Sequence, residues 1–211
     1  FGYGRGLGVD LDINKVYNSR AHGYHALQAN LVDIPLPKKA CRYVIMSHFL
    51  EHLYTADDAR KAIRNGIAIA KEFVYIQQPY FDADGYLAQN GLKLYWSDWH
   101  GHRNHMTTLD FYKILIRFLD EGIISRFVIG GYQPIKRLSN VALHPIVAPK
   151  DQSIFDPDIH PKKSSGLLPL KVPVFCEIRV LIATTDHDIT NEQIAAVGPL
   201  QVFFDSVHLK R

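Results

Sequence analysis

The chain has 211 residues, of which 47% are hydrophobic and 21% are charged. This length and balance exclude a fibrous or disordered chain and are typical of one compact domain with a sizeable core. The formal charge of +3 comes from scattered Lys and Arg rather than from a dense basic face, which does not favour nucleic acid as a partner.

No apolar run approaches the roughly 20 residues that cross a bilayer, and the first residues, FGYGRGLGVD, lack the form of a signal peptide. We therefore expect a soluble cytoplasmic protein without a membrane span. Cys41 and Cys176 stand far apart and have no CxxC partner, so neither a disulfide framework nor a thiolate metal site is indicated.

Short apolar runs alternate with helical patterns in the first part of the chain. Residues 6–11 (GLGVDL) form an apolar run that ends in an acid, which is typical of a buried parallel strand. The other elements expected here are a helix near 14–22, an apolar run at 26–31, a buried strand at 43–46 (YVIM), a helix opened by Thr55 and a strand at 72–77.

The second part of the chain predicts a clearer helix and two more strands. Thr107 and Asp110 have capping-box spacing, and the helix that they open would end at Gly122. Strong strand patterns follow at 123–129 and 175–183. Strands that alternate with helices and end in two neighbouring strands predict an α/β fold: a Rossmann-like three-layer sandwich with a mostly parallel sheet and an antiparallel pair at its end.

The stretch 130–173 between these last strands is rich in proline and histidine and lacks clear periodicity. A connection of this length is usually functional, and we expect it to cover an acceptor site or to form a contact between subunits of a homodimer. We divide the chain into one domain at 1–185, with 130–173 as an insertion, and a C-terminal tail at 186–211.

The acid at the end of the first strand is the first candidate for binding chemistry. Asp10 in GVDLD stands where the two hydroxyls of a nucleoside ribose can be held, although a solvated acid at a strand end has the same pattern. Glycines at alternate positions precede it, and these allow a backbone to approach a ligand closely.

Four segments in order are more specific than any one of them: GVDLD, NLVDIPLP, VIMSHFLEHL and EFVYIQQPYF. This run, over 6–81, resembles the class I S-adenosylmethionine-dependent methyltransferases, in particular their small-molecule, type 11-like branch. A weaker match continues through HRNHMT into the following helix. The resemblance implies S-adenosylmethionine as cofactor and methyl transfer to a small-molecule acceptor.

Position by position, the resemblance implies a cofactor site. Asp10 would bind the ribose, Leu11 would pack on the adenine, and the Asn30 side chain and Leu31 amide would meet the adenine ring. Ser47 and His48 would lie near the methionine part and the transferred methyl. Gly2 and Gly4 would belong to the glycine loop. His48 is the candidate catalytic base, although a structural polar role fits it equally well and a base is needed only if the acceptor must lose a proton. His52 is the other nearby candidate, but we expect it to be structural, packing or capping after Leu50.

The family's first strand and complete glycine loop would precede residues 6–11 and lie at the centre of the sheet. We therefore expect either further residues upstream of Phe1 or a gap in the sheet, with residues 1–5 as a remnant of the loop. If the chain has no such strand, cofactor binding should be weak, which favours a non-catalytic, scaffold-like methyltransferase fold.

Aromatic and histidine side chains crowd the stretch 80–105. They can form the wall of an acceptor pocket or a core beneath a loop, and we name as candidate substrate-binding residues Tyr80, Trp96, Trp99, His102 and His105.

Two further enzyme classes compete with methyl transfer. His100, His102 and His105 have the short spacing of a metal site, which suggests a metal-dependent hydrolase. An NAD-linked oxidoreductase would explain the acid and the glycines but not SHFLEHL. Within the methyltransferase interpretation, no metal is expected.

Overall fold

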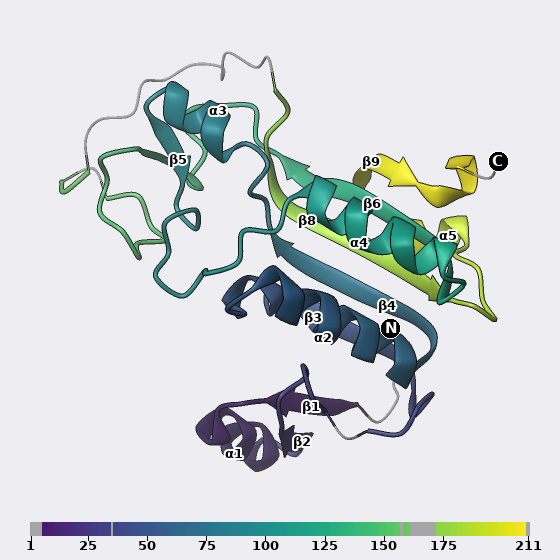
Figure 1. Cartoon of the computed structure of the whole chain (residues 1–211). Coiled ribbons are helices and arrows are strands. Elements are labelled where there is room, and N and C mark those ends of the chain that lie inside the picture. Colours follow the sequence, from purple (N-terminus) through teal and green to yellow (C-terminus); the bar gives the residue numbers. More distant parts are fainter. Residues whose placement is uncertain (1–5, 35, 157, 161–171, 210–211) are drawn as a thin grey trace.

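The computed structural model describes residues 6–34, 36–156, 158–160 and 172–209, and Figure 1 shows their arrangement. Its main element is a sheet with the strand order β3-β4-β8-β6-β9. The bounds of these strands are β3 Cys41–Ser47, β4 Ala70–Pro79, β8 Phe175–Thr184, β6 Ile124–Pro134 and β9 Leu200–Asp205.

Most strands of this sheet share one direction. β3 is parallel to β4, and β8 is antiparallel to both β4 and β6, so β4 and β6 also run the same way. β9 is antiparallel to β6. The α/β fold expected from the alternating pattern is confirmed, and β8 supplies the antiparallel partner expected near the end of the chain.

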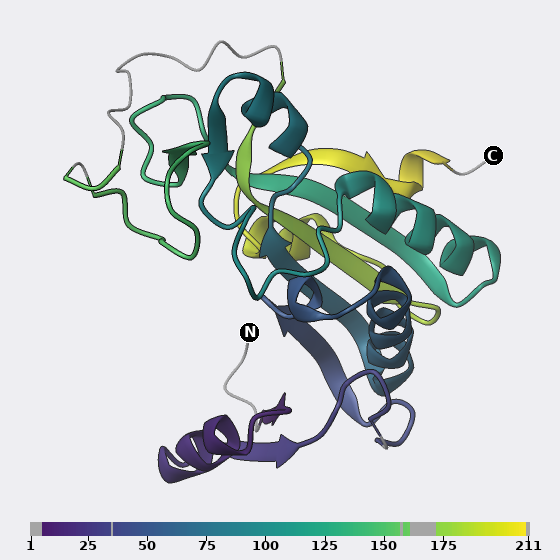
Figure 2. The same ribbon diagram turned by 60° about the vertical axis from the view of Figure 1, so that its left-hand side comes forward.

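Two amphipathic helices, α2 (Ala56–Ile69) and α4 (Thr108–Asp120), pack on the same face of the sheet (Figures 1 and 2). Both begin where the sequence predicts. The Thr55 side chain accepts a hydrogen bond from the Asp58 amide, and Thr107 and Asp110 form a reciprocal capping box. Each cap satisfies amides that have no partner inside the helix.

The core divides at the sheet into two clusters. The larger one joins α2 and α4 to the side chains on one face, including Val74, Ile76 and Phe127. The smaller one joins Tyr75 and Leu181 on the opposite face to the short helix α5 (Asn191–Ala196). Because strand side chains alternate between faces, β4 contributes to both clusters, and the molecule has three layers.

Parts of the chain without a clear sequence pattern also form regular structure. Within 130–173, β6 continues to Pro134, and β7 (Leu143–Pro145) pairs with β5 (Leu92–Leu94), next to α3 (Asp84–Gln89). Within 186–211, α5 and β9 form, followed by a 3₁₀ turn at Ser206–Leu209.

The N-terminal elements form a small unit of their own. β1 (Leu7–Asp10) and β2 (His25–Gln28) pair in parallel, and α1 (Ile13–Ala21) connects them. In the described part of the chain, β1 pairs with β2 alone and β3 pairs with β4 alone, so residues 6–11 do not pair with 43–46. Every described helix is too short or too polar to traverse a lipid bilayer.

Gly131 in β6 is required by close packing. A Cβ at this position would lie 2.6 Å from Cγ of Phe175 and 2.7 Å from Cζ of Phe203, closer than carbon atoms pack. We predict that Gly131→Ala lowers the free energy of unfolding by about 1–3 kcal/mol, because buried rings must shift. Urea denaturation measures this change.

Gly85 in α3 is the matched control, because no atom lies within 4 Å of its added Cβ. Gly85→Ala should be neutral or stabilising, since alanine is a better helix former than glycine. Equal losses in the two variants would contradict the packing argument.

Candidate functional site

His48 follows the last residue of β3 in an unusual backbone conformation. Its φ of 48° lies in the left-handed region, which costs a residue with a side chain about 1–2 kcal/mol. Its amide donates a hydrogen bond of 2.8 Å to the carbonyl of Gln77 on β4. The neighbouring strand therefore holds the strained residue in place, and such strain is common at functional sites.

The imidazole of His48 is half-buried among polar groups. Its Nδ1 lies 3.4 Å from Oε1 of Glu51, and its Nε2 lies 3.8 Å from Oε1 of Glu177. Nε2 is also 3.2 Å from the side-chain nitrogen of Gln77. The interaction with Glu51 raises the pKa of His48, and partial burial opposes this shift. Ser47, paired with Gln77 across the strands, is exposed beside it.

Glu51 lies in the 3₁₀ turn Leu50–His52 after β3, and its side chain is completely buried. In the described residues, neither carboxylate oxygen has a hydrogen-bond partner. The main-chain carbonyl of Glu51, in contrast, accepts hydrogen bonds from the amides of Arg103 (2.9 Å) and Asn104 (3.1 Å). These two bonds join the turn after β3 to the connection that precedes α4.

His102 and His105 of this connection both contact Phe81, and Nε2 of His105 donates to the carbonyl of His102 at 3.1 Å, but their other partners differ. His102 donates a hydrogen bond through Nδ1 to the carbonyl of Trp96 at 2.9 Å, and burial lowers its pKa. The ring of His105 stacks on Phe81 at 4.2 Å, and the side-chain hydrogen bond to Asp84 raises the pKa of His105.

The five candidate substrate-binding residues lie in one region, but they are not equally accessible. Tyr80 and Trp96 are 4% and 7% exposed and belong to the main core, where the Trp96 ring nitrogen donates to the carbonyl of Tyr80 at 3.0 Å. Burial raises the pKa of Tyr80. Trp99 is half-buried beside His102, and His105 is exposed.

The three-histidine metal set proposed from spacing is wrong for the residues that the structure describes. His100 and His105 do not join His102 in a group of close ligand atoms. His105 turns toward Asp84 and Phe81 instead. The metal-dependent hydrolase built on these three residues therefore has no support.

Asp10 ends β1 and organises the turn that follows. One carboxylate oxygen accepts the Asp12 amide at 2.9 Å, and the other lies 3.6 Å from Nζ of Lys15. Asp12 in turn caps α1 by accepting the amide of Asn14. Leu11, between the two acids, is 60% exposed. Gly2 and Gly4 lie outside the described residues.

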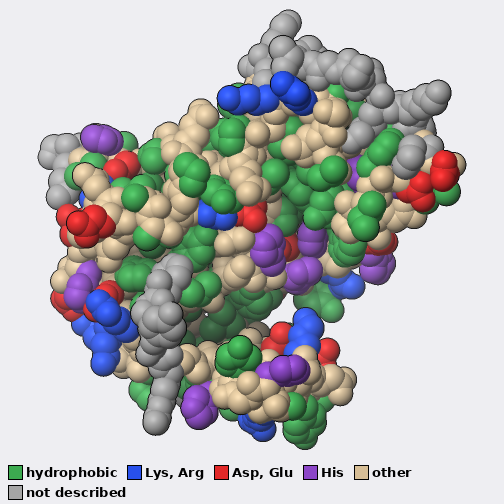
Figure 3. Space-filling view, turned by 180° about the vertical axis from the view of Figure 1, so that it is seen from behind, with side chains coloured by type: hydrophobic (Ala, Val, Ile, Leu, Met, Phe, Trp, Pro, Cys, Tyr) green, Lys and Arg blue, Asp and Glu red, His purple; other side chains and the backbone are tan. Residues whose placement is uncertain are grey.

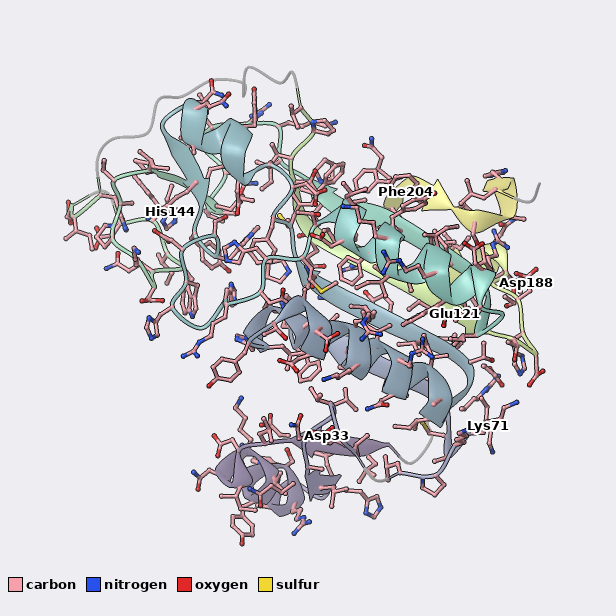
Figure 4. The ribbon with its side chains drawn as sticks, in the orientation of Figure 1. Asp33, Lys71, Glu121, His144, Asp188 and Phe204 are labelled. Carbon is pink, nitrogen blue, oxygen red and sulfur yellow. The ribbon has the colours of Figure 1, made fainter. Side chains whose placement is uncertain are left out.

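The turn after β2 connects the N-terminal unit to α2. The side-chain oxygen of Asn30 accepts the amide of Val32 at 3.0 Å. Asn65 of α2 donates through its side-chain nitrogen to the carbonyls of Val32 (2.6 Å) and Leu31 (3.4 Å). Asp33, labelled in Figure 4, lies in the same turn. Asn65 thus ties this unit to the body of the molecule.

Figure 3 shows a hollow between the N-terminal unit and the body, with histidine side chains gathered on the body above it. The partners that sequence reasoning missed are Asn65, Gln77 and Glu177. Only the pair of glutamines at the end of β4 gave a signal, because polar residues interrupt an apolar strand there.

Comparison with known proteins gives information about the fold. No family model matches the chain, and neither does any curated protein. A S-adenosylmethionine-dependent methyltransferase from Archaeoglobus fulgidus is similar in structure, with a TM-score of 0.54 at 14% identity over 84% of this chain and 75% of that one. A S-adenosylmethionine-dependent methyltransferase from Methanosarcina mazei has a TM-score of 0.48 at 10% identity, over 84% of this chain and 81% of that one. The chain has the methyltransferase fold that its motifs predict.

The left-handed backbone at His48 can be tested by comparing two substitutions. His48→Ala and His48→Gly both remove the imidazole, but only glycine adopts a φ of 48° without strain. We predict that the glycine variant is more stable than the alanine variant by about 0.5–1 kcal/mol, because relief of strain exceeds the gain of freedom in the unfolded chain. Thermal denaturation measures the difference, and a more stable alanine variant would contradict it.

The connection made by Asn65 can be tested by hydrogen exchange. Asn65→Ala removes the donor to the carbonyls of Leu31 and Val32, so we predict faster exchange of the amides of Val32 and Asp33. Asn90→Ala is the matched control, since Asn90 also donates to a backbone carbonyl, that of Tyr86 in α3. Unchanged exchange at Val32 and Asp33 in Asn65→Ala would show that other contacts hold the unit.

Proposed function

We propose that this protein binds S-adenosylmethionine and transfers its methyl group to a small-molecule acceptor. The observation that carries the proposal is the set of polar groups at the carboxyl ends of β3 and β4 in a chain with a methyltransferase fold. In open α/β sheets, ligands bind outside the carboxyl ends of the strands. Ser47, His48 and Gln77 all lie at that edge.

The residues proposed to hold the nucleoside have the chemistry that it requires. Asp10 is partly exposed and accepts one amide at 2.9 Å, which leaves oxygen lone pairs for the two ribose hydroxyls. Leu11 offers an exposed apolar side chain for the adenine. The side-chain oxygen of Asn30 accepts one amide and has a second lone pair, and Leu31 lies within the bonded turn.

The bound cofactor would supply an activated methyl group, and this chain would contribute placement. Ser47 and His48 are proposed to border the methionine part, with the His48 backbone held by Gln77. Holding two reactants in line and excluding water accounts for much of such a rate enhancement. Trp99, His102 and His105 are the candidate acceptor contacts, because they are more exposed than Tyr80 and Trp96.

Calorimetric titration with S-adenosylhomocysteine tests the cofactor. We predict saturable binding at one site, weakened about ten- to a hundredfold by Asp10→Asn, because hydrogen bonds to a charged acceptor contribute about 1.5–3 kcal/mol. Asp120→Asn removes the same charge at the exposed end of α4 and should bind normally.

Three other outcomes separate the competing interpretations. No binding of S-adenosylhomocysteine to the folded protein would remove the proposal and favour the scaffold interpretation. Binding of NAD in its place would indicate an oxidoreductase. Equal loss of affinity in Asp10→Asn and Asp120→Asn would show that Asp10 does not contact the ribose.

A further inference from the structure

Glu51, His52 and His102 bring three metal-ligating side chains to one place. The ligand atoms of the three all lie within 4.8 Å of one another. Two of the residues are adjacent in the 3₁₀ turn after β3, and His102 comes from the connection before α4. The imidazoles of His52 and His102 meet edge to face, with centroids 5.0 Å apart.

Each imidazole is held by a hydrogen bond from one ring nitrogen to a backbone carbonyl. Nδ1 of His52 donates to the carbonyl of Gly101 at 3.0 Å, and Nδ1 of His102 donates to the carbonyl of Trp96 at 2.9 Å. Because a carbonyl can only accept, Nδ1 of each ring is the donor in these bonds, and Nε2 is the ring nitrogen that remains for a metal ion. Metal-binding histidines are usually held in this way, by a carbonyl or carboxylate that accepts the other ring N–H.

The carboxylate of Glu51 needs a positive partner. It is completely buried, and neither of its oxygens has a hydrogen bond within the described residues. An unpaired buried charge is costly, so such groups are usually paired or bind metals. His48 approaches only Oε1, at 3.4 Å, and its own side chain is 47% exposed. A cation between Glu51 and the two histidines would neutralise the buried carboxylate.

The backbone holds the three ligands in position. The carbonyl of Glu51 accepts hydrogen bonds from two backbone amides, as described above. In addition, the side chain of Asn104 donates a hydrogen bond to the carbonyl of Leu50 at 3.2 Å. Gly101 packs on His52, because its Cβ position lies 3.4 Å from Nδ1 of that ring. Bonds of about 2.0–2.2 Å place the ligands of one ion closer together than 4.8 Å, so a bound ion would draw the three side chains toward one another.

We propose that Glu51, His52 and His102 bind a divalent transition-metal ion of the zinc type. Two imidazole nitrogens and one carboxylate are a common set for such ions, and three protein ligands leave a fourth position for water or a substrate oxygen. His52 is exposed, so this position is reached from the surface. The site does not depend on the proposed methyl transfer.

Titration of the purified, tag-free and chelator-treated protein with Co²⁺ and Zn²⁺ tests the site. Co²⁺ reports through its visible spectrum, which changes when imidazole and carboxylate replace water, and calorimetry gives the Zn²⁺ stoichiometry. We predict one ion per chain and a rise in melting temperature with Zn²⁺, since a ligand that binds only the folded state stabilises it. The absence of stoichiometric binding would overturn the proposal.

Variants identify the ligands. Glu51→Gln, His52→Gln and His102→Gln should each weaken Zn²⁺ binding about tenfold or more, since even the partners of metal ligands affect affinity by about 10–100-fold. His100→Gln is the matched control, because His100 is exposed in the same connection and lies outside the group. Loss of binding in His100→Gln together with normal binding in Glu51→Gln would assign the ion elsewhere.

Two further readouts keep the result interpretable. Circular dichroism without metal shows whether each variant folds, and Glu51→Gln should do so, because it replaces a buried charge with a neutral group of the same size. A titration with S-adenosylhomocysteine in the presence of chelator reports cofactor binding separately. Failure of the metal site and failure of the proposed function are thus distinguishable.

Discussion

The carbonyl oxygen of Glu51 accepts two consecutive amides, those of Arg103 and Asn104, and the candidate site depends on this contact. It joins the turn that follows β3 to a connection about 50 residues further along the chain, which would otherwise be an exposed loop. Because the donors lie on adjacent residues, the connection is fixed in position and direction. His102 is thereby placed beside His52, and Glu51 is sealed from solvent.

Local patterns predicted the elements that have strong local signals. The capping box of Thr107 and Asp110 and the apolar stripe of α2 are each contained within a few turns of chain, so a helix follows from the sequence alone. β7 and β9 are different. β7 has three residues, and β9 is a half-exposed edge strand, so each is defined by the partner with which it pairs rather than by its own periodicity.

The site, like the fold, has some residues that local sequence patterns indicate and others that only the folded sheet brings together. The motif around Ser47 and His48 indicated which strand end carries polar chemistry, but not its partners. Glu177 reaches this edge from β8, which pairs with β4 only in the folded sheet, and Asn65 contacts Val32 across the space between two units. The spacing of HGHRNH also predicted a wrong ligand set, because adjacent residues of an irregular connection point in different directions. Only His102 turns toward Glu51.

The buried carboxylate links these observations. A buried carboxylate is maintained in a fold only if something offsets its desolvation, and two interactions can do so for Glu51. One is the ion pair with the half-exposed imidazole of His48, and the other is the proposed ion between His52 and His102. The first would leave Oε2 of Glu51 without a partner. The second uses both histidines in the orientation that their carbonyl hydrogen bonds impose. An ion at this position would bind Glu51 and His52 in the turn after β3 and His102 in the connection that carries the candidate acceptor contacts. Its coordination bonds would therefore hold these two segments together.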